Sequence, residues 1–274
     1  MADSLIDDAT LTRPEQHIFL SPHYDDIALS AGATVRRLAD LGRRPETLIL
    51  FGSEPDPNAP LSSFATGMHE GWGLDSREVI ARRRAEEDRA AAAIGAIVRL
   101  LPFHDAIYRG HAYLSDDDLF STPAPADQDL PERIVASLDL PAAPDATVRF
   151  YAPLGVGRHV DHQIVFTAAS QLAAAGWDVW LYEDVPYALR NGARDARVAE
   201  VSTANPVALR GLVPAAGTWD AKLDGILSYP SQLETIFHHY VGIAPTRDAI
   251  SDGLVAYGRS PDESHVSERF WRFV

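Results

Sequence analysis

Two short clusters contain the side chains best suited to chemistry. They read Ser21-Pro22-His23-Tyr24-Asp25-Asp26 and Gly157-Arg158-His159-Val160-Asp161-His162. Two imidazoles, a carboxylate and one open position for water form a set that zinc favours, and zinc lowers the pKa of its bound water from about 15.7 to about 7. A further carboxylate, Asp25, could accept the proton of that water, and a further imidazole, His159, could donate to an oxyanion or leaving group. Together the clusters predict metal-assisted hydrolysis of an amide.

Each cluster also has a plain structural interpretation. Asp26 and Asp161 both stand at the expected start of a helix, where a carboxylate commonly caps free backbone amides. Capping alone accounts for the first cluster about as well as metal binding does. It accounts less well for the second cluster, because two histidines flank the aspartate just beyond a strand.

The composition of the 274 residues narrows the chemistry. The chain has no cysteine, which excludes a disulfide framework, a thiolate zinc site and a cysteine nucleophile. Its net charge of -15 argues against nucleic acid and anionic membranes as partners. The acidic N-terminal segment lacks a signal-peptide pattern, and no apolar run reaches the length of a membrane span. We therefore expect a cytoplasmic protein.

The elements that must position the clusters alternate between strands and helices. The patterns predict strands over 17–22, 47–52, 97–102, 147–153 and 178–184, and helices over 26–41, 76–94, 131–139 and 160–175. This alternation predicts a Rossmann-like, three-layer α/β/α fold with a mostly parallel sheet, in which ligands bind beyond the carboxyl ends of the strands. Both clusters follow such strand ends, so we expect them to form one site.

The remaining segments carry weaker signals. Beyond residue 185 we expect a strand over 207–213, helices over 218–228 and 231–239, and a packed aromatic C-terminal segment. We predict a single domain over 1–274, with residues 1–15 loosely ordered. The polar connections 54–74 and 103–130 and the segment after 185 should build the specificity pocket.

The two clusters resemble those of the PIG-L/LmbE-like, zinc-dependent N-deacetylases, the GlcNAc-PI de-N-acetylase-like family. The resemblance rests on two motifs: a strand–Ser-Pro-His-x-Asp-Asp–helix loop and a later His-x-Asp-His loop. The resemblance extends over about residues 17–240, and its further supports are Arg83…Glu86, Asp105, and Lys222…Tyr229-x-Ser231-Gln232. Members of this family remove acetyl or longer acyl groups from the amines of amino sugars. The resemblance therefore implies a small N-acyl amino sugar or glycoconjugate as the substrate.

Carried over residue by residue, the resemblance implies a role for each polar side chain. His23, Asp26 and His162 would hold Zn²⁺, or another divalent metal such as Fe²⁺. The general base would be Asp25, and the general acid or oxyanion stabiliser would be His159, oriented by Asp161. The substrate contacts would be Arg83, Tyr24 and Asp105, with an ion pair to Glu86 as the other interpretation of Arg83.

The chain departs from the family pattern at two positions. Many members have Pro where this chain has Tyr24, and Glu where it has Ile27; the missing carboxylate could weaken metal affinity or alter histidine positioning. This combination is similar to the antibiotic-tailoring branch. Two alternatives stay open, an amidase acting on a thiol conjugate or other non-sugar amide, and a catalytically inactive family member acting as a binding protein. The sequence does not define the oligomeric state.

Overall fold

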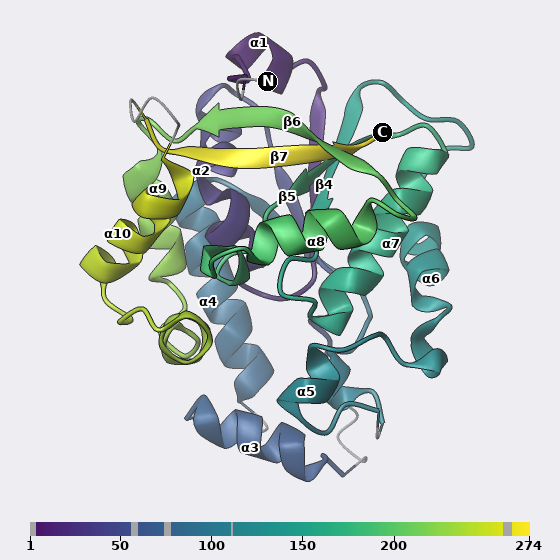
Figure 1. Ribbon diagram of the computed structural model, residues 1–274, viewed down its shortest axis with the longest axis vertical. Helices are drawn as coiled ribbons and strands as arrows, with labels where there is room; N and C mark the ends of the chain where they lie inside the picture. Colours follow the sequence, from purple (N-terminus) through teal and green to yellow (C-terminus); the bar gives the residue numbers. More distant parts are fainter. Residues whose placement is uncertain (1–3, 56–59, 74–77, 111, 260–264) are drawn as a thin grey trace.

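One sheet organises the molecule. The computed structural model describes residues 4–55, 60–73, 78–110, 112–259 and 265–274. In these ranges seven strands form a sheet in the order β3-β2-β1-β4-β5-β7-β6 (Figure 1). Their bounds are β1 Gln16–Ser21, β2 Glu46–Ile49, β3 Ile97–Leu100, β4 Val148–Pro153, β5 Asp178–Tyr182, β6 Val207–Pro214 and β7 Ser267–Phe273.

Strands β1 to β5 pair in parallel. A parallel strand covered on both faces carries a near-continuous apolar run, and β4 is buried at every residue. These five strands correspond to the five predicted in the first part of the chain, with small differences at their ends. The mostly parallel sheet is confirmed.

Strand β7 runs antiparallel to both of its neighbours, β5 and β6. The predicted strand 207–213 corresponds to β6, whereas the aromatic C-terminal segment was expected only to pack. Phe270 is indeed fully buried, but it is buried as part of a strand that pairs from Ser267 to Phe273 with β6.

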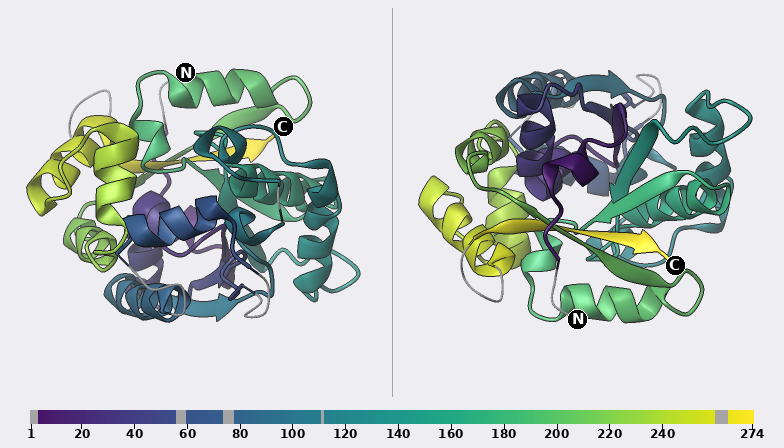
Figure 2. Two further views of the ribbon diagram at one scale, coloured as in Figure 1. Left: turned by 90° about the horizontal axis from the view of Figure 1, so that it is seen from below. Right: turned by 90° about the horizontal axis from the view of Figure 1, so that it is seen from above.

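Helices cover both faces of the sheet (Figure 2). α2 (Asp26–Asp40), α4 (Val79–Ile94) and α9 (Trp219–Ile226) pack against one another, and α6 (Leu130–Ser137) packs against α7 (Val160–Ala174). Successive residues of a strand face opposite sides, and Phe19 joins the hydrophobic cluster of Ile27 in α2 while Leu20 joins that of Ile164 in α7. The two helix groups therefore form separate layers, and the three-layer prediction is confirmed.

The long polar connections contain short helices. The first carries α3 (Ser63–Gly71), and the second carries α5 (Asp116–Leu119) and the 3-10 turns η1 (Ala106–Tyr108) and η2 (Pro125–Asp127). Figure 1 shows α3 and α5 at the same end of the molecule, away from β6 and β7. Both connections therefore contribute to one end of the fold.

The later part of the chain adds further helices. These are the 3-10 turn η3 (Tyr187–Leu189), α8 (Ala193–Val201), the π-helix η4 (Glu234–His239) and α10 (Arg247–Gly258). The helix expected over 231–239 corresponds to the π-helix. None of the helices in the described ranges is long and apolar enough to cross a membrane.

The N-terminal segment differs from expectation. Residues 4–15, which we expected to be loosely ordered, include α1 (Asp8–Leu11), whose Leu11 is 1% exposed. Leu5 forms a parallel bridge with Leu212, and the Ile6 N–H donates to the Leu212 carbonyl at 2.7 Å. Burial of this apolar side chain and pairing along β6 fix the segment; residues 1–3 lie outside the described part.

Candidate metal centre

The candidate site lies where the strand order reverses. β1 is flanked by β2 on one side and by β4 on the other, although β4 follows much later in the sequence. Open α/β sheets bind ligands at this type of position, beyond the carboxyl ends of the two diverging strands. The loop after β1 leads into α2 and the loop after β4 leads into α7, so the two polar clusters meet there.

The structure brings His23, Asp26 and His162 together. Nδ1 of His23 lies 3.6 Å from Oδ2 of Asp26, and Nε2 of His162 lies 3.4 Å from Oδ1 of the same carboxylate. All three residues are buried. Two imidazole nitrogens therefore face one carboxylate from either side, in a pocket largely shielded from solvent.

The opposite nitrogen of each imidazole donates to a buried carboxylate. Nε2 of His23 donates to Oδ2 of Asp161 at 2.9 Å, and Nδ1 of His162 donates to Oδ1 of Asp184 at 2.6 Å. Such bonds fix the tautomer, which leaves the lone pairs of His23 Nδ1 and His162 Nε2 directed toward Asp26. This donor set fits a divalent metal, and the carboxylates behind it are the partners that metal-binding histidines usually have.

His159 lies beside the pair with a different hydrogen-bonding pattern. Its ring centroid is 4.8 Å from that of His23 and 5.4 Å from that of His162. Nδ1 of His159 accepts the backbone N–H of Asp161 at 3.3 Å, so in the neutral ring Nε2 carries the proton. Burial holds the pKa of His159 well below its ordinary value. The side chain is therefore arranged as a neutral hydrogen-bond donor.

Two alternative ligand groups occur among the described residues. His23, His159 and His162 can each offer a ring nitrogen within 4.8 Å of the others, and His23 can also group with Asp105 and Asp161. The carboxylate of Asp161, however, already accepts from His23 and from the Ala106 N–H at 3.0 Å, and it forms an ion pair with Arg109 at 2.7 Å. Asp161 is therefore better placed to orient the ligand His23 than to bind a metal itself.

We expected Asp161 to orient His159, but within the described residues the Asp161 carboxylate forms no hydrogen bond with the His159 ring. The side chain of Asp161 instead holds His23, and only its backbone N–H reaches His159. Burial would raise the pKa of Asp161, but Arg109 and His23 lower it below its ordinary range. Asp161 therefore remains an anion, which suits its place behind an imidazole.

Asp25 points toward the site because of an unusual backbone conformation. Its φ is 87°, and although it is the N-cap residue of α2 its side chain makes no capping hydrogen bond. Oδ2 accepts from Arg83 Nη2 at 3.2 Å, and the backbone N–H of Asp25 donates to Glu87 at 3.1 Å. Burial raises the pKa of Asp25 to about 8 against the opposing effect of Arg83, with a further contribution from Asp26. The carboxyl group is thus held free for proton transfer.

A cavity opens above these residues. It is lined by His23, Asp25, Asp26, Arg83, Asp105 and His159, together with side chains from the long connections and from the segment after residue 185: Met68, Trp72, Ile107, Leu119, Pro186, Tyr187, Gln232, Ile236 and Tyr240. Both expected loops and the later segment therefore contribute to the walls. Asp105 also lies 3.7 Å from His23 Nε2.

Tyr24 does not line this cavity, and the expected substrate contact is wrong for it. Its side chain is 1% exposed and its hydroxyl donates to the Gly52 carbonyl at 2.8 Å. Arg83 lines the cavity, as the first interpretation expects; the other interpretation, an ion pair with Glu86, finds no support in the described residues, where Glu86 pairs with Arg82 at 3.2 Å. The side chain of Tyr24 instead packs in the hydrophobic cluster that contains Phe19 and Ile27.

Several polar residues of the site were not found from the sequence. Asp184 and Arg109 lie outside any recognised pattern, and Glu87 is held by the Tyr229 hydroxyl at 2.6 Å. Asp184 is the last residue of the predicted strand 178–184 and lies just beyond the observed β5, which ends at Tyr182; a carboxylate at a parallel strand end was a usable signal.

Comparison with known proteins identifies the relatives of this chain. The family model of the GlcNAc-PI de-N-acetylases, PIG-L, matches residues 18–173. A 2'-N-acetylparomamine deacetylase from Niallia circulans is 33% identical over 191 residues, covering 62% of this chain and 66% of that relative. One from Streptomyces fradiae is 31% identical over 276 residues, covering 93% and 88%. The solved zinc-inhibited form of teicoplanin deacetylase is 22% identical, with a TM-score of 0.74 over 94% of this chain and 98% of that one.

Fold and relatives together define a hydrolase of the N-deacetylase class, and its site offers side chains that could hold a divalent metal. The chain belongs to the PIG-L family, that of the GlcNAc-PI de-N-acetylases. The predicted family and the predicted class of enzyme are confirmed.

Proposed function

We propose that this N-deacetylase uses zinc to remove an acetyl group from the amine of an amino sugar in a natural-product intermediate. The observation that supports this most directly is the pair of imidazoles that face Asp26, each fixed from behind by a carboxylate. Because two relatives are named 2'-N-acetylparomamine deacetylase, an N-acetylated aminoglycoside is the first substrate to test.

The charge of the cavity suits such a substrate. Three aspartates, Asp25, Asp26 and Asp105, line it together with one arginine, Arg83, so acidic side chains outnumber basic ones. The chain as a whole carries a net charge of -15. An acidic cleft attracts polycationic ligands, and aminoglycosides carry several amines. Trp72, Tyr187 and Tyr240 provide aromatic surfaces for the faces of sugar rings.

We assign the metal to His23, Asp26 and His162. Two nitrogens and one carboxylate oxygen leave room for water and substrate, as in catalytic zinc sites. When bound there, zinc lowers the pKa of a water to about 7 and polarises the acyl carbonyl. The carboxylates of Asp161 and Asp184 keep both imidazoles in the tautomer that binds.

Asp25 is assigned as the general base. Its carboxylate takes a proton from the attacking water, the water oxygen bonds to the carbonyl carbon, and the C–N bond then breaks. The same proton passes to the leaving nitrogen, so the products are the free amine and acetic acid, which then ionises to acetate by releasing its proton to the amine or to solvent. Arg83 holds Asp25 at 3.2 Å and thereby fixes the base.

His159 is assigned as the donor to the developing oxyanion. Its Nε2–H is available because Nδ1 already accepts the Asp161 N–H. A donor in place before the reaction stabilises negative charge on the carbonyl oxygen without reorganisation. His159 therefore has a different role from His23 and His162, which are assigned to the metal.

The inactive-protein alternative rests on the two departures from the family pattern, Tyr24 and Ile27, and it predicts a site occluded by Tyr24. Tyr24 lies in the core, outside the lining of the cavity, and so gives that alternative no support. The other alternative, an amidase acting on a thiol conjugate, would need a cavity suited to a different leaving amine. A panel of substrates distinguishes this amidase from an amino-sugar deacetylase. Zinc as the particular metal, a cytoplasmic location and a single domain over 1–274 remain predictions.

The test compares three forms of the enzyme on 2'-N-acetylparomamine, an N-acetylglucosaminide and a thiol-linked amide. Asp25→Ala should keep stoichiometric metal and lose about 10²- to 10⁴-fold in kcat. His23→Ala should lose both metal and turnover, and Asp195→Ala, at an exposed helix position, should change neither. Full activity after chelation, or hydrolysis of the thiol conjugate alone, would show the proposal to be wrong.

A further inference from the structure

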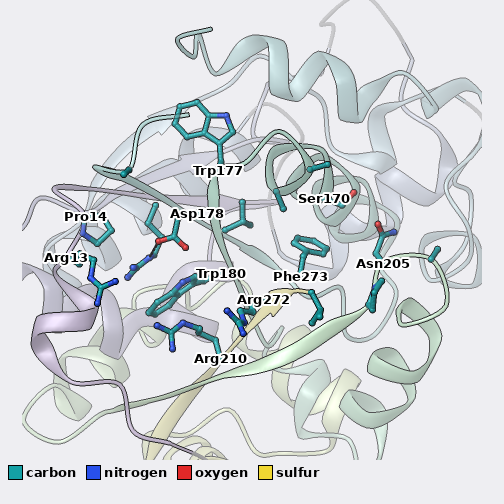
Figure 3. Close-up of a pocket in the computed structure, with 18 residues that line it drawn as sticks. Arg13, Pro14, Ser170, Trp177, Asp178, Trp180, Asn205, Arg210, Arg272 and Phe273 are labelled. Carbon is teal, nitrogen blue, oxygen red and sulfur yellow. Dashed lines mark hydrogen bonds and ion pairs between the residues drawn. The ribbon is translucent and has the colours of Figure 1, made fainter. Parts of the chain in front are cut away.

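A second cavity lies at the opposite edge of the sheet from the metal centre. It has a volume of about 590 Å³, and its walls include Arg13, Arg149, Trp177, Trp180, Arg210 and Arg272 (Figure 3). Arg149 and Asp178 belong to the amino ends of β4 and β5, whereas the metal centre follows the carboxyl ends of β1 and β4. We call this cavity the arginine pocket.

The arginine pocket concentrates positive charge in an acidic protein. Four arginines line it, with Asp178 as the one acidic side chain among its described lining residues, and the whole chain has a net charge of -15. Asp178 is already paired, because its Oδ2 accepts from Arg149 Nε at 2.7 Å. Within the described ranges, no ion pair is formed by Arg13, Arg210 or Arg272.

The floor of the arginine pocket is a rigid stack. Arg149 is 3% exposed, and its guanidinium carbon lies 3.7 Å from the centroid of the Trp180 ring. Its Nη1 also donates to the Leu11 carbonyl at 3.1 Å. The Arg210 guanidinium lies 5.1 Å from the same ring. Two guanidiniums are therefore held against one indole instead of extending freely into solvent.

The cations in the arginine pocket repel one another. Partial burial lowers the pKa of Arg210, and the charges of Arg149 and Arg272 lower it further, with a smaller contribution from Arg13. A bound anion would relieve this repulsion. The cost of assembling like charges at one place is typical of sites that bind a ligand of opposite charge.

We propose that the arginine pocket binds a phosphorylated small molecule. Planar guanidiniums match the geometry of phosphate oxygens and can bind them in pairs. The volume lies in the range of small-ligand sites, and Trp177 and Phe273 add apolar surface beside the arginines (Figure 3). A small phosphorylated ligand can enter a concave site, whereas a long nucleic acid would be repelled by the acidic surface around it.

The experiment measures binding of pyrophosphate and AMP by calorimetry on the metal-loaded enzyme, with ionic strength held constant by NaCl. We expect saturable binding of both ligands. Arg210→Ala/Arg272→Ala should weaken it at least tenfold, and Arg13→Ala, at an exposed position, should weaken it more mildly. Arg247→Ala is the matched control, since that partly exposed arginine lies on α10 and pairs with Asp224, and it should leave binding unchanged.

Phosphate can also bind metal ions, so a second control is needed. His23→Ala should retain pyrophosphate binding, because the arginine pocket is separate from the metal centre. Thermal melts establish that each variant is folded, and Arg13→Ala/Arg272→Ala replaces the first double variant if that one is not. Binding that survives loss of the arginines, or that is absent in the wild type, would overturn the proposal. Tighter binding of hexaglutamate than of either phosphate would overturn it in favour of an acidic peptide.

Discussion

Asp184 shows how much a single carboxylate behind a ligand can control. It accepts from His162 Nδ1 at 2.6 Å and from the Val156 N–H at 2.8 Å, so it ties the imidazole to the loop after β4. With the carboxylate in place, Nε2 of His162 keeps its lone pair toward Asp26. Removal of the charge would weaken both the orientation and the basicity of the ligand.

We therefore predict that Asp184→Asn binds metal about 10- to 100-fold more weakly. The amide can accept only one of the two hydrogen bonds and supplies no negative charge. Metal affinity is measured by competition with a chromogenic chelator, and turnover should recover in part at high metal concentration. Asp195→Asn, at an exposed position on α8, is the matched control. Equal affinities for Asp184→Asn and wild type would contradict the prediction.

At the scale of residues, the sequence places the two clusters correctly but not their supports. His23, Asp26 and His162 could be grouped because short motifs at two strand ends bring them to the same edge of the sheet. Asp184 and Arg109 could not be grouped with them, because their contacts depend on tertiary packing that leaves no local pattern. Tyr24 was misplaced for a related reason, since a side chain at a loop start can turn into the core or into the cavity.

At the scale of elements, the loop from β4 to α7 depends on close approach to another segment. Gly157 has a φ of 87°, and a Cβ added there would lie 2.5 Å from Tyr187 Cγ. Tyr187 belongs to η3 and lines the cavity above the metal centre. Because the contact atom lies at the root of the ring, the side chain cannot move away without displacing η3.

Gly157→Ala should therefore lower the free energy of unfolding by about 2 to 4 kcal/mol and also lower kcat/KM. Gly217→Ala is the matched control: its φ is 81° and nothing lies within 4 Å of an added Cβ. That variant should lose about 1 kcal/mol from the positive φ alone and keep its activity. Urea denaturation and steady-state kinetics give both quantities. Equal losses of stability in the two variants would show that Tyr187 adjusts freely.

The elements themselves divide into those with local signals and those without. β1 to β5 and the helices between them follow from apolar periodicity and from Gly95, which caps α4 in the left-handed conformation. β7 could not be predicted as a strand, because its pairing with β5 and β6 requires the chain to return across the sheet. α3 and α5 lie in polar connections whose short helices depend on burial against the cavity walls.

At the scale of the whole molecule, stability depends on a buried histidine remote from the metal centre. His17 is 1% exposed; its Nε2 donates to the Pro14 carbonyl at 3.1 Å and its Nδ1 accepts from the Tyr151 hydroxyl at 3.0 Å. Burial, with a further effect of Arg149, lowers the pKa of His17 to about 4. The neutral imidazole is therefore the form that fits the fold.

Since the unfolded chain protonates His17 at a higher pH than the native protein does, stability should fall as the pH decreases from about 6.5 to about 4. The contribution of His17 to that loss should be about 3 kcal/mol, and it should be fully retained above the unfolded pKa. Urea denaturation of wild type and His17→Gln at both ends of this range isolates the effect, because other titrating groups are shared. An equal loss of stability in wild type and in His17→Gln over this pH range would contradict the role of His17.

The division of the metal centre between two distant loops has a consequence for biosynthesis. Asp161, which supports His23, follows it by 138 positions, and β4 must lie beside β1 before the two clusters can meet. A nascent chain that has emerged only through β3 contains His23 and Asp26 but none of the groups that complete or orient the ligand set. With the proposed ligand set, metal acquisition comes after the second half of the sheet has been translated and docked, so the ion cannot guide the earliest folding of the first half.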